Sequence, residues 1–296
     1  MLDEKLIALI TEEVVRQLSA NGRVVLPERI PRTEEPGSAR GQAQGPSNGS
    51  KAVVGTDRLL EDPLDPESLE RMKKRTTARI GVGKAGARLK TQTLLALRAD
   101  HARAQDSVFA DVDPSFIERL GLLSIESQAR DRNTHITRPD LGRKLCPKGV
   151  EAIQQHCVMS PDVQIYASDG LSSAAIEANL EKILPVLTEG LQAKGLKVGT
   201  PFYMRFGRVA AEDQVAEVLG AKVVCVLIGE RPGLATAESM SAYIVYNSYV
   251  GIPEAKRTVV SNIHKDGLTA VEAGAYITEV ISQILERKAS GVDLVK

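Results

Sequence analysis

The chain has 296 residues, of which 43% are hydrophobic, and its 38 Lys and Arg residues balance its 38 Asp and Glu residues. This zero net charge argues against a protein dedicated to nucleic acid, because such proteins normally carry a basic excess. The sequence has no apolar run long enough to cross a membrane and no signal peptide, so we expect a cytoplasmic protein with no membrane segment.

The first 20 residues predict an amphipathic helix, because apolar side chains from Leu2 to Leu18 fall on one helical stripe and charged side chains on the other. Residues 21–64 contain few large apolar side chains and many Pro, Gly, Ser and Glu residues, which is typical of a flexible linker. A helix on such a tether is suited to docking on another protein. The alternative is that it packs on its own domain.

Residues 65–150 predict a helical region, with helices after Pro66, over 94–103 and over 111–123. Between the first two helices, residues 81–86 read Gly-Val-Gly-Lys-Ala-Gly, the spacing of dinucleotide-binding turns. The acidic residues that follow, Asp100 and Asp106, lie in the helical-looking segment 94–106 rather than at the end of a second strand. A flexible basic loop is the favoured interpretation. The charged segment 135–145 is interpreted as an interface in preference to a catalytic cluster.

From residue 151 onward, strand and helix patterns alternate, and Pro185 is expected to interrupt one of the helices. This alternation predicts an α/β fold, a mostly parallel sheet with helices on both faces, preceded by the smaller helical region and the flexible amino-terminal segment. The predicted strands are 163–167, 196–206, 223–228, 242–246 and 258–260, and the predicted helices begin near 173, 210 and 269.

Four polar turns follow or end predicted strands, at residues 168–170, 207–209, 229–233 and 259–262. In a parallel sheet these turns meet at one edge, where such sheets bind ligands, and their glycines allow close backbone approach. The sequence lacks a P-loop, a nucleophile elbow, an H-E-x-x-H motif and paired cysteine motifs, so we predict no catalytic residue and no metal ligand. Cys225 is expected to be a buried small hydrophobe, and His264 a surface loop residue.

Six long runs resemble the small subunit of ethanolamine ammonia-lyase, over about residues 70–296. They are TRPDLGRKLC (137–146), SDGLSS (168–173), GLKVGTPFYMRFGRV (195–209), LGAKVV (219–224), IGERPGL (228–234) and SNIH (261–264).

The resemblance implies an adenosylcobalamin-dependent enzyme that converts ethanolamine to acetaldehyde and ammonia by a radical route. It implies that a large TIM-barrel subunit holds the substrate, and that a Rossmann-like domain of the small subunit covers the corrin from the other side. The D-x-H-x-x-G motif of another cobalamin class is absent, which implies that the cofactor keeps its own dimethylbenzimidazole on cobalt.

Carried over onto this sequence, the resemblance implies corrinoid contacts at Val209, Glu230 and Val259. Relatives can carry cysteine where Val259 stands, so a contact there is expected to use the backbone. The resemblance also associates the amino-terminal helix with packaging into a bacterial microcompartment, which would make shell proteins a second class of partner.

The resulting domain prediction has four parts. Residues 1–20 form a docking or targeting helix, 21–64 a linker, 65–150 a helical region that packs on the partner subunit, and 151–296 the cobalamin-contacting domain. Two alternatives remain open: an NAD(P)-binding oxidoreductase that uses the 81–86 loop, and a non-enzymatic adaptor.

Overall fold

The computed structural model describes residues 60, 62–76 and 78–294. The chain divides into two compact units, and the boundary between Ala96 and Leu97 falls within helix α3 (Thr91–Phe109). The predicted helix at residues 1–20 and nearly all of the predicted linker at 21–64 lie outside the described residues. Those two predictions therefore stay predictions.

The described part of the smaller unit contains helix α2 (Pro66–Lys74) and a short hairpin of β1 (Lys84–Ala85) and β2 (Arg88–Leu89). Asp65 caps α2 by accepting a hydrogen bond from the Ser68 N–H at 2.9 Å. The glycine motif of residues 81–86 thus leads into a hairpin, and Gly86 lies in its turn with φ +64°. A dinucleotide-binding motif needs a turn from a strand directly into a helix, which this segment does not form.

A six-stranded sheet forms the centre of the larger unit, in the order β3-β5-β4-β6-β7-β8. Neighbouring strands are parallel from β3 to β6, whereas β7 is antiparallel to both β6 and β8. The predicted α/β fold with a mostly parallel sheet is confirmed. The strands are β3 (Leu123–Glu126), β4 (Val163–Ser168), β5 (Phe202–Arg205), β6 (Val223–Gly229), β7 (Met240–Tyr246) and β8 (Thr258–Ile263).

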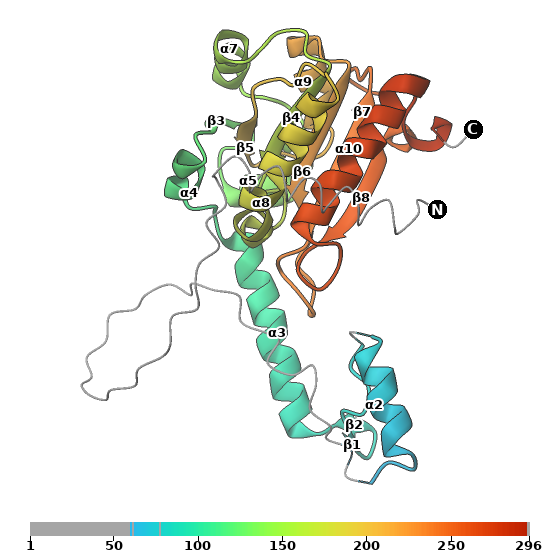
Figure 1. Cartoon of the computed structure of the whole chain (residues 1–296). Helices are drawn as coiled ribbons and strands as arrows, with labels where there is room; N and C mark the ends of the chain where they lie inside the picture. The colour runs from blue at the N-terminus through green and yellow to red at the C-terminus, as the bar shows by residue number, and fades with distance from the viewer. Residues whose placement is uncertain (1–59, 61, 77, 295–296) are drawn as a thin grey trace, which may run out of the picture. The chain divides into compact units, whose positions relative to one another are not determined.

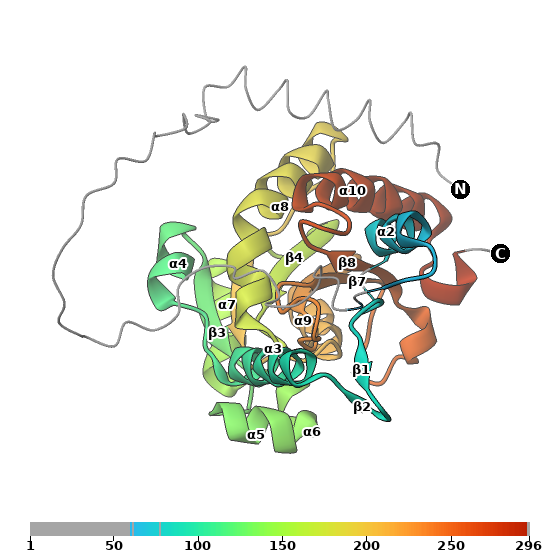
Figure 2. The same cartoon turned by 90° about the horizontal axis from the view of Figure 1, so that it is seen from below.

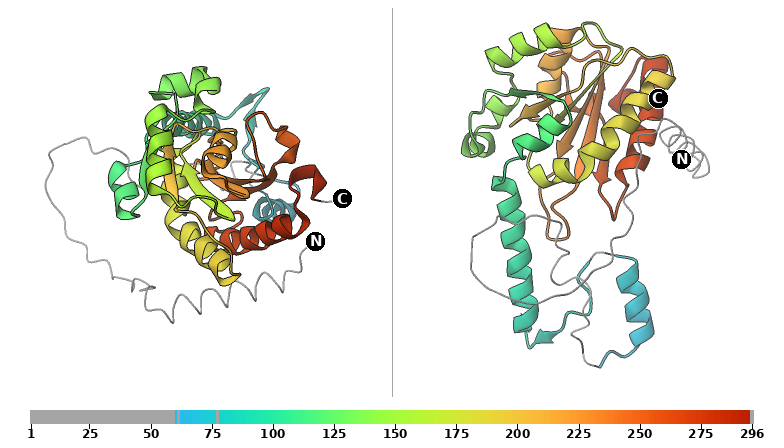
Figure 3. Two further views of the ribbon diagram at one scale, coloured as in Figure 1. Left: turned by 90° about the horizontal axis from the view of Figure 1, so that it is seen from above. Right: turned by 60° about the vertical axis from the view of Figure 1, so that its left-hand side comes forward.

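Helices cover both faces of this sheet (Figures 1 and 2). Helices α8 and α10 pack on one face, and α7 and α9 on the other, as the two further views also show (Figure 3). No described helix is both long and apolar enough to span a bilayer. The helices are α4 (Pro114–Arg119), α5 (Arg132–Thr137), α6 (Pro139–Gly142), α7 (Pro147–His156), α8 (Ser173–Ala193), α9 (Ala211–Leu219) and α10 (Ala270–Arg287), with 3-10 turns η1 (Glu254–Lys256) and η2 (Gly291–Asp293).

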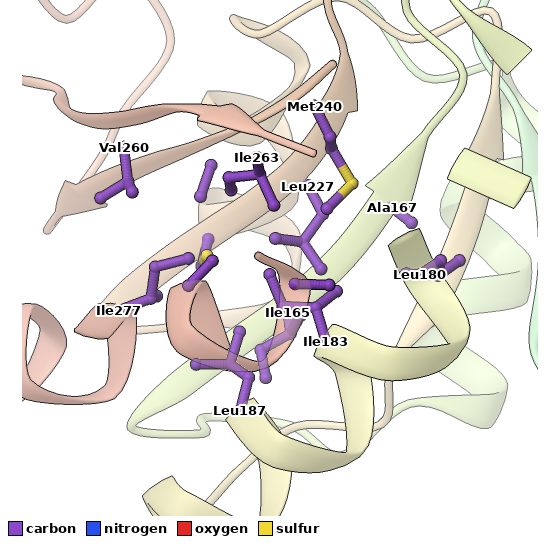
Figure 4. Packing of buried hydrophobic residues seen from close by; sticks show 14 of the residues in the cluster. Ile165, Ala167, Leu180, Ile183, Leu187, Leu227, Met240, Val260, Ile263 and Ile277 are labelled. Atoms are coloured by element: carbon purple, nitrogen blue, oxygen red, sulfur yellow. The ribbon is translucent and has the colours of Figure 1, made fainter. Parts of the chain in front are cut away.

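The larger hydrophobic core lies between the sheet and helices α8 and α10 (Figure 4). Ile165 and Leu227 of the central strands meet Ile183 of α8, and all three side chains are fully buried. The strands β4 and β6 are buried at every position, which is the pattern expected of parallel strands covered on both faces.

Helix α8 runs through Pro185 without a break, which corrects the expected interruption. Proline inside a helix costs about 3 kcal/mol, because its N–H is missing and its ring crowds the preceding turn. One face of α8 fully buries Ile176, Leu180, Ile183 and Leu187, and each such side chain contributes about 1.5 to 3 kcal/mol. The packing of the helix therefore outweighs the proline.

Strand β7 begins two residues earlier and β8 ends three residues later than predicted, and two other strands differ further. The expected strand at 196–206 is shorter, since only Phe202–Arg205 forms β5, with a separate bridge between Val163 and Val198. Strand β3 was not predicted at all. It lies at the sheet edge with Ile125 as its one buried residue, so its sequence lacks the apolar run that marks the central strands.

The connections reverse the strand order at the carboxyl ends of the central strands. From β4 the chain crosses through α8 to β5 on one side, and from β5 it crosses back through α9 to β6 on the other side of β4. Ligands bind open α/β sheets where the strand order reverses in this way.

Candidate functional site

The four polar turns do meet at one edge of the sheet. Strand β8 is antiparallel to β7, which is antiparallel to β6, so β8 ends at the same edge as the parallel strands. The Leu171 N–H donates to the Gly229 carbonyl at 3.1 Å, and the Asn262 N–H donates to Glu230 Oε1 at 3.2 Å. The fourth segment is not a free turn, however, because Ser261 and Asn262 belong to β8 itself.

The glycines of these turns bring the turns close to one another. A Cβ atom on Gly170 would lie 2.5 Å from the Gly229 carbonyl oxygen, and one on Gly207 would lie 2.6 Å from Ser168 Oγ. The glycines were expected to let the backbone approach a ligand closely. In the structure they let neighbouring turns approach one another, and this packing fixes the turns at the edge of the sheet.

Glu230 comes directly after β6, and its carboxylate is held by three donors. Ser239 Oγ donates to Oε2 at 2.9 Å, and Ser241 Oγ and the Asn262 N–H donate to Oε1. The last donor is aimed by a β-bulge in β8, where Asn262 takes a left-handed conformation with φ +59°. The carboxylate therefore has a fixed orientation and keeps one acceptor site, on Oε2, for a further donor.

Val259 lies on β8 directly opposite Tyr243 of β7. Its side chain is 46% exposed, whereas the next residue, Val260, is buried under α10. Tyr243 packs at the margin of the core formed with α7 and α9, and so does Val209. The three predicted contact residues thus border the sheet face on which α9 packs against β6, and Val259 stays partly exposed on that face.

Val209 lies in the turn between β5 and α9, and its side chain is half-buried. Its carbonyl accepts the Glu212 N–H at 3.0 Å. No acceptor in the described part of the chain pairs with the Val209 N–H. That backbone donor is therefore free for a ligand.

A buried ion pair holds the turns after β4 and β5 together. Arg132 of α5 donates to Asp169 Oδ2 at 2.7 Å, and Asp169 Oδ1 accepts the Phe206 N–H at 2.7 Å. Burial raises the pKa of Asp169 to about 6, despite the opposing effect of Arg132. At neutral pH the carboxylate is therefore ionised and paired.

His135 belongs to the same network. Its ring is fully buried, with Nδ1 2.9 Å from the Phe206 carbonyl oxygen and Nε2 2.8 Å from that of Gly170. Two such acceptors favour the doubly protonated ring, but burial and the charges of Arg208 and Arg132 lower its pKa to about 4. The ring is neutral at neutral pH and inaccessible to substrate. The predicted interface over residues 135–145 stays a prediction, and in the structure His135 is part of the buried network.

Phe206 occupies a left-handed backbone conformation with φ +60°, which is costly for a bulky side chain. The Phe206 N–H donates to the Asp169 carboxylate. The Phe206 carbonyl accepts from Ser127 Oγ at 2.8 Å and lies beside the His135 ring. The ring is covered by the Arg205 and Arg132 guanidinium groups at 4.5 and 4.9 Å. The strained residue directs the chain from β5 toward Arg208 and Val209.

A second buried cluster joins α9 to β8. Arg257 lies just before β8, and its guanidinium donates to Glu212 Oε1 and, at 2.6 Å, to Asp213 Oδ1, both on the first turn of α9. Asp213 also accepts from Ser248 Oγ at 2.7 Å. Because Val209 precedes α9 and Val259 follows Arg257, this cluster fixes the two residues relative to each other.

Sequence reasoning missed most of these supporting residues. Ser239 and Ser241 fell in a predicted loop, although their position opposite Glu230 follows once β6 and β7 are paired as a hairpin. No local signal marked Arg132 or Arg257, because each pairs with a carboxylate about 40 residues away in sequence. Cys225 is fully buried, as predicted, and burial raises the pKa of its thiol.

The chain is similar to known proteins over most of its length. A family model described as ethanolamine ammonia-lyase light chain (EutC) matches residues 66–295. The chain is 56% identical to the ethanolamine ammonia-lyase small subunit of Clostridium perfringens over 236 residues, 80% of each chain. It is 55% identical to that of Clostridium tetani over 241 residues, 81% of this chain and 82% of the other. With the small subunit of Fusobacterium nucleatum it shares 54% identity over 235 residues, 79% of this chain and 80% of the other.

Together, these matches and the α/β fold define a subunit of an ammonia-lyase. The chain belongs to the ethanolamine ammonia-lyase light chain family.

Proposed function

We propose that this chain is the small subunit of an adenosylcobalamin-dependent ethanolamine ammonia-lyase and that it holds the corrinoid against a large TIM-barrel subunit. Together the two subunits would convert ethanolamine to acetaldehyde and ammonia. The observation that carries the proposal is the meeting of Val209, Glu230 and Val259 around one open sheet face at the carboxyl edge.

The chemistry of these groups fits a corrinoid. A corrin ring is a broad apolar disc bordered by amide side chains. Val259 and Tyr243 offer an apolar surface, the Val209 N–H offers a donor, and the Glu230 carboxylate offers an acceptor. The turns that carry these groups are tied to one another, which limits the ordering cost of binding.

In this proposal Glu230 accepts from an amide of the corrin, Val209 donates through its backbone, and Val259 packs against the ring. When bound, adenosylcobalamin would supply the radical chemistry. This chain's own residues position the cofactor and exclude water from one side. Catalytic groups and substrate belong to the large subunit.

Two other functions receive less support. An NAD(P)-dependent oxidoreductase would use the glycines of residues 81–86, which lie at the hairpin of β1 and β2 instead of at a helix start. A non-enzymatic adaptor would not need the fixed acceptor at Glu230 or the free N–H at Val209.

Reconstitution tests the proposal. Purified chain alone should show no lyase activity, and activity should appear when the large subunit and adenosylcobalamin are added together. Glu230→Ala in the assembled complex should raise the Kd for cobalamin about tenfold, the effect expected from losing a hydrogen bond to a charged group. Activity from the chain alone, or an unchanged Kd, would contradict it.

The amino-terminal segment is proposed to target the enzyme to an ethanolamine-type microcompartment in the cytoplasm. Deletion of residues 1–20 should leave the activity of the assembled complex unchanged and abolish co-localisation with shell proteins in cells. Loss of activity with co-localisation retained would reverse the assignment.

A further inference from the structure

Arg208 lies at the edge of the sheet where the parallel strands end, and part of its guanidinium has no acceptor in the protein. Its backbone N–H donates to the Gly142 carbonyl at 2.8 Å, and its Nη2 donates to the His135 carbonyl at 2.7 Å. Gly142 makes room for the side chain, since a Cβ atom there would lie 2.7 Å from Arg208 Cγ. The Nε atom is buried and has no acceptor. The guanidinium is thus oriented by the protein but not satisfied by it.

Two further arginines, Arg143 and Arg231, lie close enough to Arg208 for their charges to act on it. Repulsion from Arg143 and Arg231 lowers the pKa of Arg208, after the larger effect of burial. None of the three forms an ion pair with a carboxylate in the described residues.

Two acidic groups of the neighbouring turns pair with other arginines: Asp140 with Arg138 at 2.8 Å, and Asp169 with Arg132 at 2.7 Å. Glu230 accepts from Ser239 and Ser241, which are neutral, so it keeps its charge. Of these three carboxylates, Glu230 alone is left to balance the charges of Arg208, Arg143 and Arg231. Like charges gathered in this way are unfavourable unless an anion joins them.

The position of these cations relates them to the proposed site. Arg208 directly precedes Val209, and Arg231 directly follows Glu230. We propose that Arg208, with Arg143 and Arg231, binds the phosphodiester in the nucleotide tail of the cobalamin. A planar guanidinium with unused N–H groups matches phosphate oxygens, and a charge-assisted contact of this kind is stronger than a neutral hydrogen bond.

This inference rests on the proposed function, so its test compares two corrinoids. Cobinamide has the same corrin ring as cobalamin but lacks the phosphate and the nucleotide. Binding of hydroxocobalamin and of cobinamide to the assembled two-subunit complex is followed by the change in visible absorption. In the Arg208→Gln complex the Kd for cobalamin should rise about tenfold or more, while the Kd for cobinamide stays within about twofold of wild type.

Three further variants sharpen the result. Arg208→Lys keeps the charge but loses the forked donors, so it should recover part of the affinity for cobalamin. Arg231→Gln alters an exposed side chain and should show a smaller effect with the same selectivity, even if Arg208→Gln folds poorly. Arg138→Gln removes one charge from the same segment, but from an existing ion pair, and should leave both affinities unchanged.

The outcomes are distinct. Equal weakening of both corrinoids, or no change in either, would overturn the phosphate site. Weaker association with the large subunit at an unchanged cobalamin Kd would also overturn it, since a carboxylate of the partner would then be the counter-ion. A wild-type complex that binds neither corrinoid would instead refute the proposed function.

Discussion

At the scale of single residues, Asp169 and His135 show how one network carries two opposite responses to pH. Burial raises the pKa of Asp169 from 3.8 to about 6 and lowers that of His135 from 6.5 to about 4. As pH rises between these values, the unfolded chain releases the Asp169 proton before the folded chain does, so stability is lost. As pH falls through the same window, the unfolded chain protonates His135 first, so stability is again lost.

We therefore expect substitutions of Asp169 and of His135 to change the pH dependence of the unfolding free energy in opposite directions. Relative to wild type, the unfolding free energy of Asp169→Asn should rise from about pH 4 to pH 6, and that of His135→Gln should fall over the same range. Urea unfolding at intervals across this window measures both slopes. Curves that run parallel to wild type for both variants would show that neither group titrates as described.

At the scale of elements, the cluster around Arg257 joins helix α9 to strand β8. The Arg257 side chain is 1% exposed and meets the buried Glu212 and Asp213 and the exposed Glu254, so three carboxylates share one buried guanidinium. Burial raises the pKa of Glu212 to about 8, and Glu212 is therefore largely protonated in the folded chain at neutral pH.

The two sides of this cluster should respond differently to substitution. Arg257→Met leaves Asp213 charged and unpaired, and should lower the unfolding free energy by about 3 to 5 kcal/mol. Glu212→Gln keeps the shape of the protonated acid and should be neutral or stabilising. Its advantage should grow as pH rises toward 8, because the unfolded wild-type chain loses the Glu212 proton well below that value. Equal destabilisation by both variants in urea unfolding at neutral pH would contradict this description.

At the scale of the whole molecule, the proposed cofactor site lies on a face of the sheet where this chain leaves Val259 exposed. Val259 and Val260 are neighbours on β8, but the first is 46% exposed on the open face and the second 7% exposed under α10. Val259→Asp should leave the stability of the isolated chain within about 0.5 kcal/mol of wild type and weaken cobalamin binding by the complex. Val260→Asp buries an unpaired charge and should destabilise the chain by about 3 kcal/mol or more. Thermal unfolding and corrinoid titration separate the two effects, and a large loss of stability in Val259→Asp would contradict an open face.

The sequence predicted the part of the fold that local patterns encode. The apolar run at 223–228 marked β6, and the polar turns after β4, β5 and β6 marked the edge where the site lies. Tertiary packing determines the edge strand β3 and the continuity of α8 through Pro185. No local sequence pattern therefore predicts either feature. For the same reason the supports of the site, such as the contact of Arg257 with Glu212 and of Arg132 with Asp169, were beyond prediction.

The bulge at Asn262 has a consequence for the chain before it meets a partner. Strand β8 is the last strand of the described sheet, and an exposed edge strand is a template for pairing with another copy of itself. Its first residue is covered by the turn of η2, where the Gly291 N–H donates to Thr258 Oγ1 at 2.8 Å, and its far end is distorted by the left-handed Asn262. The distortion that aims a backbone donor at Glu230 thus also guards newly made chains against edge-to-edge aggregation while their binding face is uncovered.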